Sequence, residues 1–302
     1  MAAHHREAGL TGMGVSSSTD RPFAKGHGTG NDFLILPDPD GGLPLSAEHT
    51  MRLCDRRTGV GADGILRAVR CAAEPEAGDM ANTAEWFMDY RNADGSRGAM
   101  CGNGIRVLAR YLVDTGLCAP GHIRIATRAG IRRVHVPDSA GAPIGVGMGR
   151  PVLPGPGGIT VTAGGRSWPA TQVDMGNPHA VVMLSDLTAP GSLRSAPLVE
   201  PTGAYPLGVT VEFVVSHTAE HLQLRVHERG VGETLACGTG ACAAVAAFRA
   251  GTRRSGPGEY LVDSPGGRLR VGVGPEGEME LAGAAQIVAH GTIGAPLWDT
   301  GA

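Results

Sequence analysis

The sequence contains one lysine, Lys25, among its 302 residues. Enzymes that use pyridoxal phosphate hold it through a lysine Schiff base, so this chain offers a single residue for that cofactor. Lys25 lies beside a glycine-rich turn between two strand-like segments. Any pyridoxal phosphate chemistry in this protein would therefore depend on that one position.

Long apolar runs and blocks of like charge are also missing. No stretch approaches the roughly 18 apolar residues that span a bilayer, so we expect no membrane-embedded segment. The formal net charge is −3 and both signs are interspersed, so we expect no binding to nucleic acid or to an acidic membrane surface. A hydrophobic content of 42% and a charged content of 18% are typical of a folded globular protein.

The first twenty residues lack the apolar core of a secretory signal. We expect residues 1–22 to form a disordered extension, with Met13 as an alternative start. The six cysteines include no Cys-x-x-Cys pair. Without an export signal, this usage favours reduced thiols and a cytoplasmic protein.

Two cysteines stand in matching contexts. Cys101 begins Cys-Gly-Asn-Gly-Ile-Arg, Cys237 begins Cys-Gly-Thr-Gly-Ala-Cys, and a helix-forming segment follows each. Glycine turns direct several backbone N–H groups one way, and the positive end of a helix attracts anions. We therefore expect an α-carboxylate to bind at these turns and the thiolate form of each cysteine to be favoured.

The surroundings of the two cysteines repeat as well. They are 136 positions apart, and a polar residue, Asn92 or Glu228, lies nine residues before each. This repeat predicts two similar half-domains that each present one cysteine at a helix N-terminus. Catalysis is the favoured interpretation; a structural thiol pair is the alternative, and zinc binding has no supporting ligand spacing. The remaining cysteines are interpreted as core residues: Cys54, Cys71, Cys118 and Cys242.

The hydrophobic pattern predicts many short strands and two long helices. We expect an α+β fold of two pseudo-symmetric domains, each an antiparallel-rich sheet wrapped around a central helix. The first domain is expected at residues 23–138, completed by a C-terminal strand within 283–302, and the second at residues 139–282. A shorter helix is predicted at Ser46–Arg56 with Ser46 as N-cap. The Gly-x-Gly-x-x-Gly that follows at residues 59–64 comes after a helix, whereas a dinucleotide site requires a preceding strand.

Several polar residues are candidates for substrate contacts. Asn31, Asn92 and Asn177 lie in turns, where asparagine is common for conformational reasons alone. Because these turns are paired between the halves, the three amides are also candidates for binding a small zwitterion. Glu228 and Arg229 precede a glycine, and they would suit an ammonium group and a carboxylate respectively.

Two histidines, His27 and His179, are weaker candidates. Each would contact substrate or support a residue that does, or would only bond to neighbouring backbone. No metal site is expected.

Five motifs together resemble the diaminopimelate epimerase family, in particular its actinobacterial branch. The resemblance runs from about Phe23 to near the C-terminus. The motifs are His-Gly-Thr-Gly-Asn-Asp-Phe at 27–33, Asp-Tyr-Arg-Asn-Ala-Asp-Gly at 89–95, Met-Cys-Gly-Asn-Gly-Ile-Arg at 100–106, Gly-Asn-Pro-His at 176–179, and Glu-Arg-Gly-Val-Gly-Glu-Thr-Leu-Ala-Cys-Gly-Thr-Gly at 228–240.

The resemblance implies a homodimeric, cofactor-independent epimerase of lysine and cell-wall synthesis that uses two bases. Its thiolate–thiol pair would be Cys101 and Cys237. Family roles carried to matching positions place the α-carboxylate on backbone N–H groups of Gly102, Asn103, Gly238 and Thr239. The amino groups would be held by Asn31, Asn177 and Glu228, and the far end of the substrate by Asn92 and Arg229.

One position departs from the family pattern, because Thr210 stands where the family usually has an asparagine. That asparagine belongs to the wall around the distal stereocentre, and losing such a hydrogen bond costs about 1–3 kcal/mol. Thr210 therefore favours a second interpretation, an epimerase of the same fold that acts on a different amino acid. A third interpretation is a non-catalytic small-molecule binding protein, although binding alone requires neither thiol.

Overall fold

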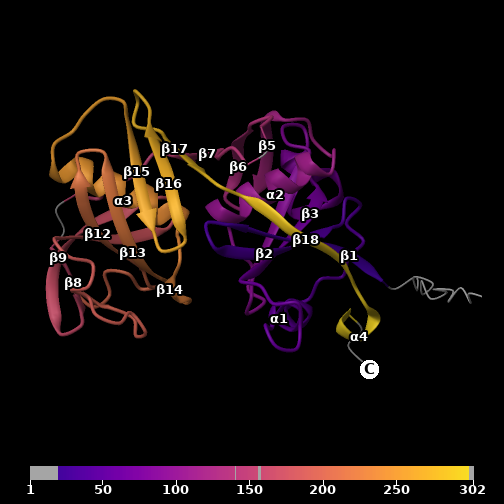
Figure 1. Cartoon of the computed structure of the whole chain (residues 1–302), viewed down its shortest axis with the longest axis horizontal. Coiled ribbons are helices and arrows are strands. Elements are labelled where there is room, and N and C mark those ends of the chain that lie inside the picture. The colour runs from indigo at the N-terminus through magenta and orange to yellow at the C-terminus, as the bar shows by residue number, and fades with distance from the viewer. Residues whose placement is uncertain (1–19, 140, 156–157, 299–302) are drawn as a thin grey trace, which may run out of the picture.

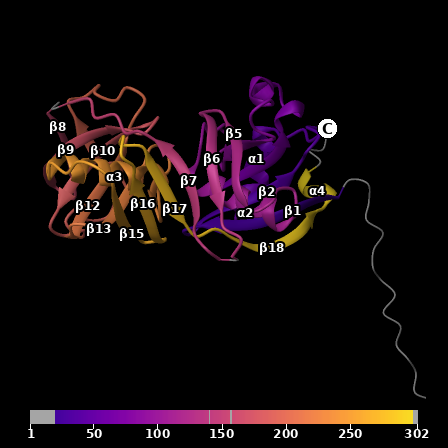
Figure 2. The same cartoon turned by 90° about the horizontal axis from the view of Figure 1, so that it is seen from above.

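The computed structural model describes residues 20–139, 141–155 and 158–298. Its strands and helices form two lobes placed side by side along the long axis (Figure 1), and the view from above shows the same separation (Figure 2). The C-terminal segment returns across the first lobe, so both ends of the described chain belong to that lobe.

The elements of the first lobe are β1 (Arg21–Gly28), β2 (Asn31–Pro37), α1 (Ala47–Cys54), β3 (Gly64–Arg70), the 3-10 helices η1 (Cys71–Ala73) and η2 (Pro75–Met80), β4 (Trp86–Asn92), α2 (Gly102–Asp114), β5 (Gly121–Thr127) and β6 (Gly130–Val136). The second lobe contains β8 (Ile159–Ala163), β9 (Arg166–Asp174), β10 (Pro178–Leu184), β11 (Leu198–Glu200), β12 (Thr210–Thr218), β13 (His221–Glu228), β14 (Gly232–Thr234), α3 (Gly238–Gly251), β15 (Gly258–Ser264) and β16 (Gly267–Val273). Between the lobes lie β7 (Ile144–Gly149) and β17 (Met279–Gly283), and the chain ends with β18 (Gln286–Ile293) and α4 (Ala295–Trp298).

The two lobes repeat one pairing scheme. In the first, β1 to β7 pair in sequence as antiparallel, parallel, antiparallel, parallel, antiparallel and antiparallel. In the second, β9, β10, β12, β13, β15, β16 and β17 follow the same series. The expected α+β fold with pseudo-symmetric, sheet-rich halves is confirmed.

Each lobe also contains one added strand, which follows the last strand of the other lobe's series along the chain. Strand β8 follows β7 and pairs with β9, and β18 follows β17 and pairs with β1. Strands β7 and β17 pair with each other, so the two expected sheets are hydrogen-bonded into one continuous series. No strand was predicted at β17, a five-residue segment in which the glutamate Glu280 interrupts the apolar residues.

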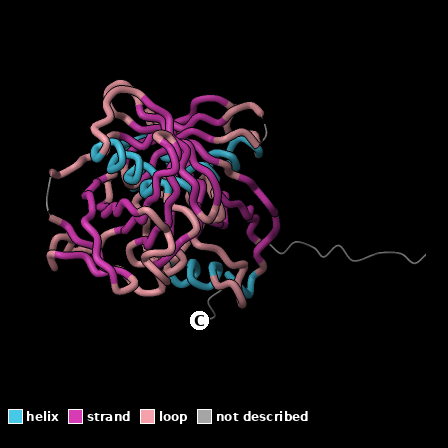
Figure 3. The backbone as a smooth tube through the Cα atoms, turned by 60° about the vertical axis from the view of Figure 1, so that its left-hand side comes forward, coloured by secondary structure: helices cyan, strands magenta, loops and turns pink. Residues whose placement is uncertain are grey.

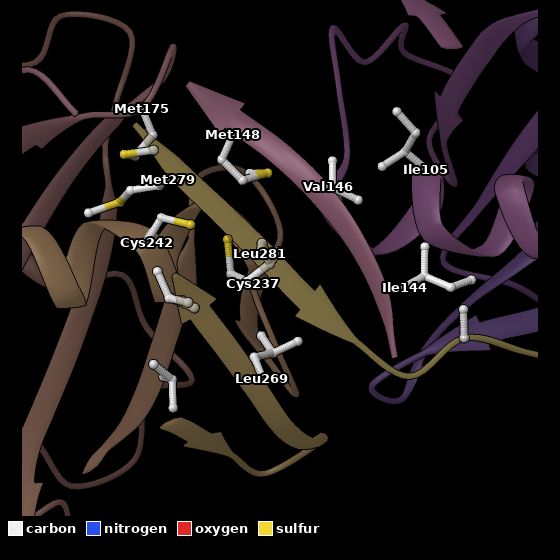
Figure 4. Close-up of a cluster of buried hydrophobic side chains, with 14 of the residues drawn as sticks. Ile105, Ile144, Val146, Met148, Met175, Cys237, Cys242, Leu269, Met279 and Leu281 are labelled. Atoms are coloured by element: carbon white, nitrogen blue, oxygen red, sulfur yellow. The ribbon is translucent and has the colours of Figure 1, made fainter. Parts of the chain in front are cut away.

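The two long helices pack against the sheets, and Figure 3 shows cyan helical segments among the magenta strands in the upper part of the view. Residues 102–112 of α2 are all buried, and α3 is buried along most of its length. A helix that is apolar all round belongs in a core, which the alanine-rich α3 satisfies. Side chains of β7 and β17 fill the seam between the helices, among them Val146, Met148 and Leu281 (Figure 4).

The glycine-rich segment after α1 is structural. Helix α1 begins at the predicted N-cap, because the Ser46 side chain accepts a hydrogen bond from the His49 N–H. After the helix, a Cβ on Gly59 would lie 2.1 Å from the carbonyl oxygen of Arg52. The glycine therefore allows the chain to fold back closely against the end of α1 and enter β3.

We expect Gly59→Ala to lower the free energy of unfolding by about 1–3 kcal/mol, because the added methyl group overlaps backbone atoms. Chemical denaturation of both proteins measures this. Gly78→Ala is the matched control, since a Cβ there meets no atom within 4 Å. Equal denaturation midpoints for the two variants would contradict the argument.

Candidate active site

The N-termini of α2 and α3 meet between the lobes. A Cβ on Gly102 would lie 3.5 Å from the Cα of Gly238, and a Cβ on Gly238 would lie 3.4 Å from the Cα of Gly102. Both positions also border Leu281 of β17, at 3.4 Å and 2.8 Å from its Cδ2 atom. The two positive helix ends thus converge on one place, where an anion is stabilised by both.

Cys101 is the N-cap of α2. Its sulfur accepts a hydrogen bond from the Gly104 N–H at 3.3 Å, in the way that a capping side chain does. Its thiol also lies 3.8 Å from the amide oxygen of Asn31. The sequence prediction that this cysteine stands at a helix N-terminus is confirmed.

Cys237 occupies the same position on α3. Its sulfur accepts from the Gly240 N–H at 3.4 Å and lies 3.4 Å from the hydroxyl of Thr239. Its exposed fraction is 7%. Figure 4 shows Cys237 beside Leu281, at the seam between the lobes. The two cysteines therefore occupy equivalent backbone positions, each as the N-cap of its helix.

The expectation that both thiolates are favoured is wrong for this structure. Burial raises the pKa of Cys101 to about 11, although the N–H groups of Gly104 and Asn103 act in the opposite direction. Burial, together with the carboxyls of Glu228 and Glu212, raises the pKa of Cys237 well above its ordinary value. Desolvation of the charged form outweighs the helix N-terminus at both sites.

Asn31 and Asn103 link the first lobe to the second. The Asn103 amide donates to the carbonyl of Ala236 at 3.0 Å and to the amide oxygen of Asn31 at 3.3 Å. Asn31 in turn donates to the carboxylate of Asp63 at 2.8 Å. These two predicted site residues therefore lie together beside Cys101, and the chain reaches Cys237 immediately after Ala236.

Glu228 and Thr210 lie on the other side of the site. The Thr234 hydroxyl donates to Glu228 at 2.5 Å, and the Thr210 hydroxyl accepts from the Arg229 N–H at 3.3 Å. Burial raises the pKa of Glu228, while hydrogen bonds from Thr234 and Cys237 oppose that rise. Glu228 is thus brought to Cys237, whereas the Arg229 guanidinium lies 3.4 Å from the carbonyl of Leu207.

Three predicted residues have no hydrogen bond to either cysteine among the described residues. Asn92 accepts from the Tyr90 hydroxyl at 2.5 Å and donates to Ser96 at 2.9 Å. Asn177 closes a turn in which its carbonyl accepts from the Met175 N–H. The buried Nδ1 atom of His27 has no hydrogen-bond partner within the described chain.

His179 is fully buried and shares a 2.6 Å hydrogen bond through Nδ1 with Glu212, which is also fully buried. Sequence reasoning missed Glu212 as a site residue. The signal was present, because Val-Glu-Phe places one carboxyl in the middle of an apolar strand. It also missed Arg106, a buried guanidinium on α2, and Asp63, the partner of Asn31.

Within residues 20–139, 141–155 and 158–298, no group of three or more metal-ligating side chains comes together. None of the helices in that part of the chain combines the length and apolar character needed to cross a bilayer. Thiols, carboxyls, amides and backbone N–H groups surround the two helix ends.

We expect alkylation of Cys101 by iodoacetamide to become faster by about tenfold per pH unit from pH 7 to pH 10, because only the thiolate reacts and burial holds its pKa near 11. Mass spectrometry of the Cys101 peptide gives the rate at each pH, with a small-molecule thiol as the reference. A rate that stops rising below pH 8 would show that the helix end dominates instead.

Comparison with known proteins identifies the family. The family model described as "Diaminopimelate epimerase" matches residues 23–154 and 171–288. A diaminopimelate epimerase of Streptomyces coelicolor is 51% identical over 282 residues, covering 91% of this chain and 96% of the relative. One from Thermobifida fusca is 45% identical over 279 residues, covering 90% and 97%.

Solved structures share the fold at low sequence identity. A hydroxyproline epimerase from Agrobacterium vitis superposes with a TM-score of 0.67 at 15% identity, covering 91% of this chain and 93% of that one. A phenazine biosynthesis protein of the PhzF family from Bacillus anthracis gives 0.65 at 18%, covering 91% and 99%. With the family match and these close relatives, the chain belongs to the diaminopimelate epimerase family and is an isomerase of the epimerase class.

Proposed function

We propose that this epimerase interconverts LL- and meso-diaminopimelate by two-base transfer of the α-proton, with Cys101 and Cys237 as the two bases. The observation that carries the proposal is the meeting of two cysteine-capped helix N-termini, with Gly102 and Gly238 in contact. An α-carboxylate held by both helix ends would place the α-carbon between the two sulfurs. The relatives' names supply the substrate.

The chemistry requires one thiolate and one thiol at the start of each turnover. The thiolate takes the α-proton from one face of the substrate and becomes a thiol, leaving a carbanion. The opposed thiol then donates its proton to the other face and becomes the thiolate. The proton count is unchanged and the configuration is inverted. Because two thiols perform both transfers, the proposed reaction uses no cofactor.

The negative charge of the carbanion spreads onto the α-carboxylate, which is where the site concentrates its donors. We assign this group to the backbone N–H groups of Gly102, Asn103, Gly238 and Thr239, which belong to the first turns of α2 and α3. Fixed dipoles aimed at developing charge stabilise a transition state more than a substrate. This stabilisation takes the place of a cofactor's electron sink.

The rest of the substrate is assigned to side chains around the two helix ends. Asn31, Asn177 and Glu228 would hold ammonium groups, and Glu228 also lies where it can accept the Cys237 proton. Asn92 and Arg229 would bind the distal carboxylate. His27 and His179 would support these contacts from behind, and a homodimer belongs to the same proposal on the family resemblance alone.

Thr210 favours a second candidate, an epimerase of the same type that acts on another amino acid. Its hydroxyl is occupied by the Arg229 N–H at 3.3 Å, beside the residue proposed to bind the far end of the substrate. A threonine in that wall offers a distal group fewer hydrogen bonds than an asparagine does. The substrate therefore has to be identified by experiment rather than by motif.

We expect Cys101→Ala and Cys237→Ala each to reduce epimerisation by about 10²–10⁴-fold or more, because each removes a proton-transferring group. The loss is measured as a slower incorporation of deuterium from heavy water at the α-carbon of the substrate. Cys118→Ala is the control, since that thiol lies beyond the C-terminal end of α2. Wild-type rates in either active-site variant would refute the two-thiol mechanism.

The substrate is tested by α-deuterium incorporation in heavy water, with LL- and meso-diaminopimelate beside a panel of common L-amino acids. We expect exchange on diaminopimelate, and we expect Arg229→Met to raise its KM by about tenfold or more through loss of the distal carboxylate contact. Exchange only on another amino acid would establish the second candidate. Exchange on none would contradict both.

A further inference from the structure

The two halves share a backbone but not their buried charges. Arg106 lies five residues after Cys101, and the matching residue five after Cys237 is Cys242. Both side chains are fully buried on equivalent helices. The burial of Cys242 raises its thiol pKa to about 12, so that side chain is neutral. The first half therefore carries a buried cation where the second carries an uncharged thiol.

Arg106 is held by neutral oxygens only. Its guanidinium donates to the carbonyl of Gly102 at 2.9 Å, to the amide oxygen of Asn103 at 2.9 Å and to the Thr29 hydroxyl at 3.4 Å. No carboxylate forms an ion pair with it in the described part of the chain. Burial lowers its pKa to about 10, which leaves it protonated at neutral pH.

A buried cation without a counter-ion is costly, so neighbouring groups that can become negative gain from ionising. The charge of Arg106 lowers the pKa of two thiols against the effect of burial, that of Cys101 and that of Cys242. The same Arg106 side chain also braces Gly102 and Asn103, which form the first turn of α2.

In the second half, an acidic side chain lies beneath the start of the helix, at a position that is apolar in the first half. In the first, Phe33 and Leu66 pack beneath the start of α2, at 3.5 Å and 3.0 Å from a Cβ placed on Gly104. The parallel registers Phe33–Gly64 and His179–Thr210 make His179 the counterpart of Phe33 and Glu212 the counterpart of Leu66.

The polar pair lies directly beneath the start of α3. A Cβ on Gly240 would lie 2.7 Å from Glu212 Oε1 and 3.4 Å from the Cys237 sulfur. Glu212 Oε2 and His179 Nε2 have no further protein partner within the described residues. An acidic group thus sits under Cys237 where apolar side chains sit under Cys101.

Other ionisable groups face both sulfurs. Glu228 acts on both and raises the pKa of each thiol, while Thr239 bonds to Cys237. Asp63 and His179 act on Glu228 with opposite signs. Glu228 acts on both thiols and also hydrogen-bonds to Cys237, whereas Arg106 acts on Cys101 and not on Cys237, and Glu212 acts on Cys237 and not on Cys101.

We propose that Arg106 and Glu212 are positioning residues that set which thiol ionises more readily, Arg106 by favouring the thiolate of Cys101 and Glu212 by keeping the proton on Cys237. The inference rests on the proposed two-thiol function, and it deepens that function by making the two bases unequal. Neither residue touches the substrate in this scheme. Each acts through the neighbouring sulfur.

The test is the pH dependence of iodoacetamide alkylation, followed separately for the Cys101 and Cys237 peptides by mass spectrometry. Arg106→Gln removes the charge and keeps a hydrogen-bond donor. We therefore expect alkylation of Cys101 at a fixed pH to slow by about tenfold or more, which corresponds to a shift of its rate profile to higher pH by about one unit. Glu212→Gln should move the Cys237 profile to lower pH by a similar amount. Arg106→Lys should restore the Cys101 profile.

The chain provides its own control for packing. His179→Phe with Glu212→Leu installs the side chains that the first half already carries under the same helix turn. This double variant should fold, shown by an unchanged near-ultraviolet circular dichroism spectrum, and still lower the Cys237 profile. The double variant replaces Glu212→Gln if that variant fails to fold. In the first half, comparing Arg106→Lys with wild type shows the effect of changing the side chain while its charge is kept.

Opposite shifts confined to the two cysteines support the proposal. Unchanged profiles, or both profiles moving in the same direction in folded variants, would overturn it. The assay needs no substrate, so its outcome is separate from that of the proposed reaction. Loss of epimerisation in the cysteine variants with unmoved profiles here would leave the function standing and remove this inference.

Discussion

The contact between Gly102 and Gly238 constrains the rest of the molecule. A Cβ added to either residue would lie 3.4–3.5 Å from the Cα of the other, and a Cβ on Gly238 would lie only 2.8 Å from the Leu281 side chain. The helices come from different lobes, so the sheets around them must also meet, which they do through the β7–β17 ladder. The chain also crosses between the lobes twice, from β7 to β8, which pairs with β9, and from β17 to β18, which pairs with β1. The connections hold the two helix ends together.

What the sequence predicted was largely local. Cysteine–glycine motifs followed by helix-forming residues placed the N-caps at Cys101 and Cys237, and alternating apolar residues placed most strands. The ladder between β7 and β17 could not be predicted, because the two strands lie more than a hundred positions apart and β17 carries a glutamate, Glu280, among its apolar residues. The direction of the thiol pKa values was also missed. A helix end is visible in sequence, whereas the depth of burial depends on the whole fold.

The residues that the sequence reasoning missed are those that break the symmetry. Arg106 lies in the motif that identified Cys101 as a candidate, and Glu212 lies in the strand that contains the candidate Thr210. Neither is needed for the fold, since the opposite half builds the same turn over Phe33 and Leu66 and places Cys242 on the equivalent helix position. Replacing buried charges by apolar groups is often neutral or stabilising. Their presence close to the two thiols therefore points to chemistry as well as to packing.

Symmetry and asymmetry have different uses in such a site. An epimerase must reach both faces of one carbon, and a two-fold repeat of strands, helix and cysteine provides two bases at opposed positions. Two identical bases would divide one negative charge equally, so half of the molecules would meet a given substrate hand with the wrong group ionised. Unequal buried charges remove that degeneracy, because each pKa unit of difference corresponds to about 1.4 kcal/mol between the two charge states. The pseudo-symmetric fold thus determines the two positions from which protons are transferred. Arg106 and Glu212 determine which of the two thiols loses its proton more readily.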